Sequence, residues 1–237
     1  MKLFTNSAGD LAAIRNICSI LDYSAALVTT ASEAEVIQAC EDAKRYKFKA
    51  VPVFPSYLPL VTRELKGTGI APQLPCAFPC GCVSTAIKQA EVEQAIGDGA
   101  KEVDMVINIA RLLDKDYKYV ENDIKTVVET AGRAGIEVKV IIEIGLVKDR
   151  DKKEALEISV AAGAAFVKTC TGFAEGRATV REIAQLVEWA KGRIKIKATG
   201  GVASLEDAQS FIDAGAERVA GRGNFVNQMR GLGIEGF

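Results

Sequence analysis

Segments with the period of β-strands alternate with segments that have the period of α-helices, and no break in composition divides the chain. Eight segments predict strands, over residues 22–27, 50–54, 75–78, 103–109, 137–144, 165–169, 194–199 and 217–221. Helices are predicted before and between them, over residues 9–21, 31–46, 83–96, 117–134, 151–162, 179–191 and 205–214. Because eight β/α units fit in 237 residues, the sequence predicts one α/β domain over residues 1–237, a TIM (β/α)8 barrel with an extra N-terminal helix.

The composition argues against several classes of function. Lysine and arginine total 30 against 31 aspartate and glutamate, so the formal net charge is −1 and gives no electrostatic reason to expect nucleic-acid or membrane binding. The first residues contain no apolar segment of signal-peptide length, and no apolar run is long enough to span a bilayer. We therefore expect a soluble, cytoplasmic protein.

The chain contains no histidine. This excludes Ser–His and Cys–His nucleophile pairs and histidine-ligated metals, so proton transfer falls to carboxylates, lysines, tyrosines or water. Three of the six cysteines, Cys76, Cys80 and Cys82, are clustered with a spacing that is uncommon in zinc sites. We expect free thiols, no metal and no cofactor, and the sequence assigns no role to the cysteine cluster.

Two lysines stand in the last positions of short apolar strands. Lys168 ends the sixth predicted strand, in Ala-Phe-Val-Lys, and Lys197 lies in the seventh, in Ile-Lys-Ile-Lys. A lysine is ordinarily a solvated cation with a pKa of about 10.4, so these positions are costly. Neighbouring parallel strands lie about 4.8 Å apart, so two inward-pointing lysines would interact strongly. A deprotonated lysine is a nucleophile towards carbonyl groups, and the pair therefore predicts covalent chemistry.

A carboxylate, Asp104, lies in the fourth predicted strand. Strand alternation puts it on the same face as Asn108 and as Glu102, which directly precedes the strand. On the inner face of a barrel, Asp104 could hold a proton or relay it through water. Alternatively, Asp104 is a structural carboxylate that pairs with Lys197. In the first predicted strand, Asp22 and Ser24 are either substrate contacts or residues that tie the first loop.

Three motifs, in this order along the chain, resemble the deoxyribose-phosphate aldolase family, the class I aldolases of the DeoC type. They are Glu-Val-Asp104-Met-Val-Ile-Asn-Ile, Phe-Val-Lys168-Thr-Cys-Thr-Gly-Phe and Ile-Lys197-Ala-Thr-Gly-Gly-Val, and the similarity covers about residues 21–230. The resemblance implies that Lys168 forms a Schiff base, that Lys197 favours the uncharged amine of Lys168, and that Asp104 assists proton transfer through water. It also implies metal-independent, reversible cleavage of 2-deoxy-D-ribose 5-phosphate to acetaldehyde and D-glyceraldehyde 3-phosphate, and it suggests a homodimer.

Glycine-rich segments follow the sixth, seventh and eighth predicted strands, and TIM barrels commonly bind phosphate after strands seven and eight. Backbone N–H groups of such segments can hold a phosphate. The predicted phosphate-binding residues are Gly172, Gly200, Gly201, Gly221, Arg222, Gly223 and Asn224. Thr171, with Asp22 and Ser24, is predicted to contact the rest of the substrate.

Several positions differ from the family pattern. The first strand reads Asp22-Tyr23-Ser24-Ala25-Ala26 where Asp-His-Thr-Leu-Leu is usual, and the second reads Val51-Pro52-Val53-Phe54-Pro55 where Val-Cys-Val-Asn-Pro is usual. The last loop has Ala220-Gly221-Arg222-Gly223-Asn224 in place of Gly-Thr-Ser-Ser-Gly, which removes two phosphate-facing hydroxyls and adds one cation, Arg222. Two alternatives therefore stay open: an aldolase of the same mechanism with a different aldehyde substrate, and a catalytically weak member that acts as a binding or scaffold protein.

Overall fold

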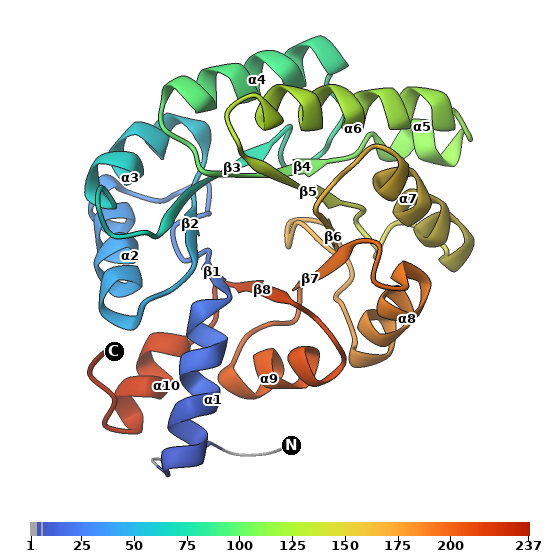
Figure 1. Cartoon of the computed structure of the whole chain (residues 1–237). Helices are drawn as coiled ribbons and strands as arrows, with labels where there is room; N and C mark the ends of the chain where they lie inside the picture. Colours follow the sequence, from blue (N-terminus) through green and yellow to red (C-terminus); the bar gives the residue numbers. More distant parts are fainter. Residues whose placement is uncertain (1–3, 6) are drawn as a thin grey trace.

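The computed structural model describes residues 4–5 and 7–237. Eight parallel strands close into a barrel in the order β1 to β8, with helices around it (Figure 1), which confirms the predicted TIM barrel. The strands are β1 Leu21–Tyr23, β2 Ala50–Pro52, β3 Ala71–Cys76, β4 Glu102–Val106, β5 Glu137–Ile141, β6 Phe166–Lys168, β7 Lys195–Thr199 and β8 Arg218–Gly221. The helices are α1 Ala8–Ser19, α2 Glu33–Tyr46, α3 Leu58–Glu64, α4 Thr85–Gly97, α5 Ile109–Leu113, α6 Tyr117–Gly132, α7 Asp149–Ala161, α8 Val180–Ala190, α9 Leu205–Asp213 and α10 Phe225–Gly231, with a 3-10 turn at Pro55–Tyr57.

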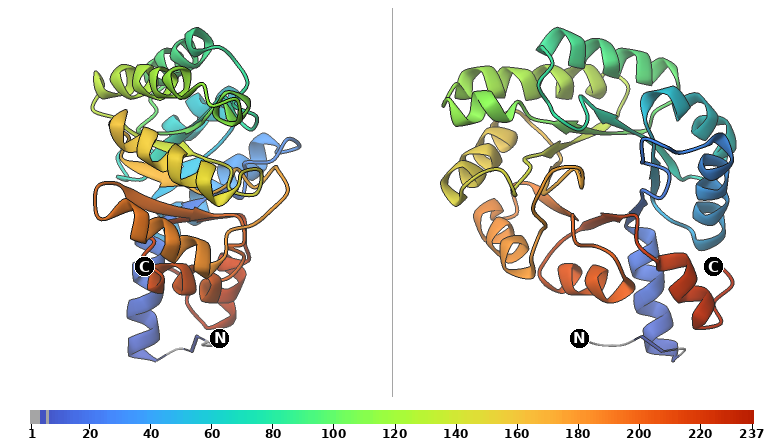
Figure 2. Two further views of the ribbon diagram at one scale, coloured as in Figure 1. Left: turned by 90° about the vertical axis from the view of Figure 1, so that its right-hand side faces the viewer. Right: turned by 180° about the vertical axis from the view of Figure 1, so that it is seen from behind.

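The predicted extra N-terminal helix is α1. It lies between α9 and α10 in Figure 1, and both views of Figure 2 keep it beside these last two helices of the chain. Ser7 caps α1 by accepting a hydrogen bond from the Asp10 backbone N–H, because the first turn of a helix has unpaired donors. The N-terminal helix thus lies beside the helices that follow β7 and β8.

Local sequence signals fix several of the other helix ends. Ser32 and Glu35 form a reciprocal capping box at the start of α2, and Thr179 and Glu182 form another at the start of α8. Gly99 has φ of +94°, which places it in the left-handed region and ends the turn after α4. These signals account for the accuracy of the predicted helices.

Several elements differ from the sequence prediction. The third strand is Ala71–Cys76 rather than residues 75–78, because the barrel pairs this segment with β2 and β4 although its two prolines argue against a strand. The fourth strand ends at Val106, and Asn108 instead caps α5 by accepting from the Arg111 backbone N–H. Helices α3 and α5 were not predicted, because elements of 7 and 5 residues carry little periodicity.

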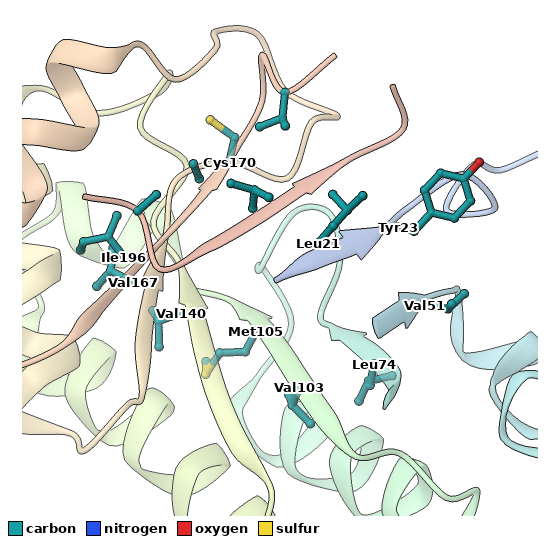
Figure 3. Close-up of a cluster of buried hydrophobic side chains, with 14 of the residues drawn as sticks. Leu21, Tyr23, Val51, Leu74, Val103, Met105, Val140, Val167, Cys170 and Ile196 are labelled. Carbon is teal, nitrogen blue, oxygen red and sulfur yellow. The ribbon is translucent and has the colours of Figure 1, made fainter. Parts of the chain in front are cut away.

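The two faces of the barrel strands carry different chemistry. The outer face is apolar and packs against the helices; Figure 3 shows this layer with Leu21, Val51, Leu74 and Ile196 among its labelled side chains. The inner face carries charged side chains at positions that alternate with the apolar ones. Ala50 and Ala220 lie in register with Asp22 on either side. Because both are small, they leave room inside the barrel for long cationic side chains.

All six cysteines are free thiols, as expected. Cys76 is buried in β3, and burial raises the pKa of its thiol well above the ordinary value, whereas Cys80 and Cys82 are exposed. In the part of the chain that the structure describes, no helix combines the length and apolar character that a bilayer crossing needs.

Candidate active site

Lys168 and Lys197 are direct neighbours across the β6–β7 pair, as the strand-end positions predicted. The Lys168 Nζ atom donates a hydrogen bond to Oδ2 of Asp104 at 2.8 Å, and the Lys197 Nζ atom donates to the same oxygen at 2.5 Å. Asp104 reaches both lysines from β4 on the far side of the interior. Both lysine side chains therefore donate to the same carboxylate oxygen of Asp104.

Asp22 is the second carboxylate partner of Lys197. Its Oδ2 atom accepts from Lys197 and from the Gln73 side chain, and its Oδ1 atom accepts from Nε of Arg218 at 2.7 Å. The side chain is fully buried, so Asp22 pairs with Lys197 inside the barrel rather than facing its open end.

A lower layer of charges continues the network. Arg218 Nη2 donates to Oε2 of Glu102 at 2.5 Å, and Lys139 Nζ donates to the same oxygen at 2.7 Å. Lys139 also lies 3.2 Å from Oδ1 of Asp104, so it links the two layers. Glu102 shares a face with Asp104, as its strand position predicted, whereas Lys139 and Arg218 were not predicted. Strand alternation was the available signal, because Lys139 is in register with Asp104, and Arg218 is in register with Lys197.

The interior network contains four cations and three carboxylates: Lys139, Lys168, Lys197 and Arg218 with Asp22, Glu102 and Asp104. This surplus of one positive charge disfavours the protonated form of the lysines in the network. Burial lowers the pKa of Lys197 to about 8, and the nearby Lys168 and Lys139 ammoniums act in the same direction against its two carboxylate partners. Lys197 therefore titrates closer to neutral pH than an ordinary lysine, and a fraction of it is uncharged there.

The carboxylates respond in the opposite way. Burial alone would raise the pKa of Asp104, but Lys168, Lys197 and Lys139 outweigh it and hold the pKa well below the ordinary value. The pKa of Asp22 is also lowered, because Lys197 and Arg218 outweigh the effect of burial. Both groups are consequently carboxylates throughout the physiological pH range.

A cavity of about 530 Å³ opens above the network at the C-terminal ends of the strands. Lys168 lines it and is the member of the trio that reaches it, whereas Lys197, Asp104 and Asp22 lie below. Of the other predicted site residues, those lining this cavity are Ser24, Thr171, Gly172, Gly200, Gly201, Gly221, Arg222 and Gly223. Asn224 borders a separate hollow of about 210 Å³, and its backbone N–H donates to the Ala203 carbonyl.

The loop after β6 forms one wall of the cavity. Glu143 accepts from the Thr171 backbone N–H at 3.0 Å, and the Thr171 hydroxyl accepts from the Phe173 backbone N–H at 3.0 Å. The Phe173 ring packs edge-to-face against Phe54 and Phe78, with centroid distances of 6.2 and 5.0 Å. Because Phe54 and Phe78 follow β2 and β3, this loop reaches across the barrel opening.

Arg222 contacts the other side of the same ring. Its guanidinium lies 5.3 Å from the centroid of Phe173, and its Nη2 atom donates to the Gly172 carbonyl at 3.2 Å. No carboxylate forms an ion pair with Arg222 among the residues that the structure describes. The cavity therefore has a cationic edge next to an aromatic wall.

The glycines of the cavity also allow two loops to approach closely. A Cβ atom on Gly223 would lie 2.2 Å from the Ala203 carbonyl oxygen, and one on Gly221 would lie 2.3 Å from the Val202 carbonyl oxygen. Only glycine fits at such distances. The loops after β7 and β8 are thus packed against each other at the cavity floor.

Known proteins share both the sequence and the fold. Residues 18–229 match the family described as DeoC/LacD family aldolase. A deoxyribose-phosphate aldolase of Bacillus subtilis is 43% identical over 204 residues, which cover 86% of this chain and 91% of the relative. A deoxyribose-phosphate aldolase 2 of Oceanobacillus iheyensis is 40% identical over 209 residues, 88% of this chain and 92% of the relative. A tetrameric deoxyribose phosphate aldolase structure from Aeropyrum pernix superposes with a TM-score of 0.81 at 27% identity, covering 88% of this chain and 87% of that one.

Proposed function

This chain belongs to the DeoC/LacD family of aldolases, and we propose that it is a class I aldolase that reversibly cleaves 2-deoxy-D-ribose 5-phosphate to acetaldehyde and D-glyceraldehyde 3-phosphate. The observation that carries the proposal is the position of Lys168. It is the nitrogen nucleophile that borders the cavity, and it shares a carboxylate oxygen with a second buried lysine.

Lys168 is the proposed Schiff-base residue. Its neutral amine adds to the aldehyde carbon C1 of the open-chain sugar, and loss of water gives an iminium ion. The iminium draws electrons as the C3 hydroxyl loses its proton and the C2–C3 bond breaks. D-glyceraldehyde 3-phosphate leaves, and the remaining enamine is protonated at C2 and hydrolysed to acetaldehyde and the free lysine.

Lys197 and Asp104 are proposed to move the protons of these steps. A group transfers protons best when its pKa lies near the working pH, and the pKa of Lys197 is about 8. Asp104 joins the two lysines, and because its pKa lies well below the ordinary value it passes a proton on and returns to the carboxylate form. A neutral Lys197 can take up the proton of Lys168 across the shared oxygen, which leaves Lys168 ready to attack.

The phosphate is proposed to bind at the β7 and β8 loops, next to Gly200, Gly201 and Gly221 to Gly223. Arg222 supports this placement, because its exposed guanidinium stands at the cavity edge with a carbonyl and an aromatic ring as its partners. Thr171 and Ser24 line the same cavity and are proposed to contact the sugar.

The test is borohydride reduction in the presence of 2-deoxy-D-ribose 5-phosphate, followed by intact mass measurement and peptide mapping. We expect a reduced adduct on Lys168 in the wild type and none in Lys168→Met. Lys195→Met removes an exposed lysine from the neighbouring strand and serves as the matched control. Absence of an adduct in the wild type, or an adduct on another lysine, would overturn the proposal.

A second candidate keeps the mechanism and changes the substrate. It is favoured by the aromatic wall, because Phe54 stands where related sequences usually carry a polar asparagine and packs against Phe173 at the cavity. An apolar wall would suit an unphosphorylated aldehyde. Comparing kcat/KM for phosphorylated and unphosphorylated sugars decides between the two, since the first candidate requires a strong preference for the phosphate. An active enzyme that loses turnover in Lys168→Met would exclude a purely scaffolding role.

The chain is further proposed to form at least a homodimer and to act in the cytoplasm. The relative from Aeropyrum pernix is a tetramer, and six free cysteines suit a reducing compartment. Light scattering of the purified protein tests the assembly, and a monomeric mass at working concentration would contradict it.

A further inference from the structure

The lower layer of the barrel network does not touch the cavity, yet it is connected to the proposed nucleophile by an unbroken series of contacts. Arg218 donates to Asp22, Asp22 accepts from Lys197, and Lys197 shares Oδ2 of Asp104 with Lys168. Every side chain in this series is at most 7% exposed. Water therefore provides little screening between one end and the other.

We propose that Arg218 is a positioning residue for the Schiff-base reaction, which orients Asp22 so that Lys197 is held against Asp104 and Lys168. The inference rests on the proposed function. Arg218 is separated from the cavity by Asp22 and Lys197, and it is not among the residues that line the cavity. Its effect on the reaction must therefore pass through its two carboxylate partners: through Asp22 to Lys197, and through Glu102 and Lys139 to Asp104.

The geometry of the guanidinium explains why an arginine suits this position. Arg218 uses Nε for Asp22 and Nη2 for Glu102, at 2.7 and 2.5 Å, so one planar group fixes two carboxylates from different strands. A lysine presents one compact charge and cannot hold both carboxylates in the same fixed geometry. Glu102 is fixed in turn by Lys139, which leaves Asp22 a single orientation.

Arg218 also supplies the surplus positive charge. Among the residues that the structure describes, the network that contains Arg218 also holds Asp22 on β1, Glu102 and Asp104 on β4, Lys139 on β5, Lys168 on β6 and Lys197 on β7. Without Arg218, three lysines would face three carboxylates, and the charged form of each lysine would be favoured. Its removal should therefore move the reaction to higher pH, whereas replacement by another cation should not.

Two variants separate orientation from charge. Arg218→Lys keeps the charge but loses the planar two-pronged geometry of the guanidinium, so we expect kcat to fall by roughly tenfold to a hundredfold, the range for a misplaced reacting group. The pH midpoint of borohydride trapping should stay at the wild-type value. Arg218→Met loses both, so we expect a similar fall and an alkaline shift of the midpoint by roughly one pH unit. KM should stay unchanged in both, because neither variant alters the cavity lining.

Lys88→Met is the matched control, because it removes a cation from a buried ion pair outside the barrel. We expect it to lower stability and to leave the trapping midpoint and the kcat of the folded enzyme unchanged. If Arg218→Met does not fold, Arg218→Lys and Asp22→Asn still test the series, and Asp22→Asn should lower kcat like Arg218→Lys.

The outcomes are distinguishable from failure of the proposed function. A wild type that forms no adduct on Lys168 contradicts the aldolase proposal itself. A wild type that forms the adduct, with variants that match its kcat and its trapping midpoint, overturns the role of Arg218 alone. Variants whose only change is a lower urea midpoint would likewise show that Arg218 is merely structural.

Discussion

Lysines are buried among carboxylates both between α4 and α6 and inside the barrel, and these two places differ in charge balance and in access. Between α4 and α6, Lys88 donates to Asp123 at 2.5 Å and to the Val106 carbonyl at 2.8 Å, and both side chains are fully buried. Inside the barrel, four cations meet three carboxylates, and Lys168 borders a cavity. Burial of a lysine therefore does not by itself indicate chemistry. Chemistry is indicated where the cations outnumber the carboxylates and one of them borders a cavity that can hold a substrate.

The electrostatic setting of each place follows from its elements. Thr85 donates to the second oxygen of Asp123, so each charged atom of the helical pair has a fixed partner. Such a pair contributes little net stability compared with apolar side chains of the same size, but loss of one partner leaves an uncompensated buried charge. The barrel network has no such one-to-one pairing, so loss of one lysine can leave it balanced.

The largest effect is expected from Lys168→Met. Turnover of 2-deoxy-D-ribose 5-phosphate should fall by on the order of 10⁴ or more, because the nucleophile is removed. The free energy of unfolding should stay unchanged or increase, since three cations then face three carboxylates. Steady-state kinetics and urea unfolding measure the two quantities. A large loss of stability would contradict the surplus charge inside the barrel.

Lys88→Met should have the opposite profile. We expect a loss of about 3–5 kcal/mol in the free energy of unfolding, because Asp123 is left buried without its cation, and no change in the kcat of the folded enzyme. The double variant Lys88→Met/Asp123→Leu should recover most of the stability. Urea unfolding of both variants checks this, and a double variant no more stable than the single one would show that the ion pair is not the cause.

Acid should destabilise the protein through the carboxylates of the barrel network. The pKa values of Asp22 and Asp104 are lower in the folded state than in the unfolded chain, so both carboxylates contribute stability above a pH of about 3.9. Below it the unfolded chain binds more protons, and the free energy of unfolding falls as the pH falls. Urea unfolding measured from pH 3 to 6 should show this fall. A profile that stays flat as the pH falls towards 3 would contradict a stabilising role for the two carboxylates.

The sequence was sufficient to predict the barrel, because strand periods and helix periods alternate along the chain through eight predicted strands. It also predicted that Lys168 and Lys197 would lie together, since both are near strand ends and neighbouring strands are in register. It did not predict Arg218 as part of the site. The contact between Arg218 and Asp22 joins residues 196 positions apart, and it exists only because β8 closes onto β1.

The position of Asp22 illustrates the same limit. The first strand was expected to place Asp22 and Ser24 together at the substrate, because residues two positions apart in a strand point to the same face. The structure puts Ser24 in the cavity lining and Asp22 beneath it, because β1 ends at Tyr23 and the chain turns. The prolines of β3 misled in a comparable way, since barrel pairing outweighs the loss of two backbone donors.

The smallest expected effect concerns a third kind of cation, one that is neither paired nor buried. Arg222 stands at the cavity edge, held by the Gly172 carbonyl and the Phe173 ring. Arg222→Gln should raise KM for 2-deoxy-D-ribose 5-phosphate roughly tenfold, the loss of one charged hydrogen bond, and should leave kcat unchanged. Stability should change by less than about 0.5 kcal/mol, because the side chain is exposed. The unphosphorylated sugar provides the control, since its KM should not respond to the substitution. Equal rises in KM for both sugars would mean that Arg222 shapes the cavity through Phe173 rather than binding the phosphate.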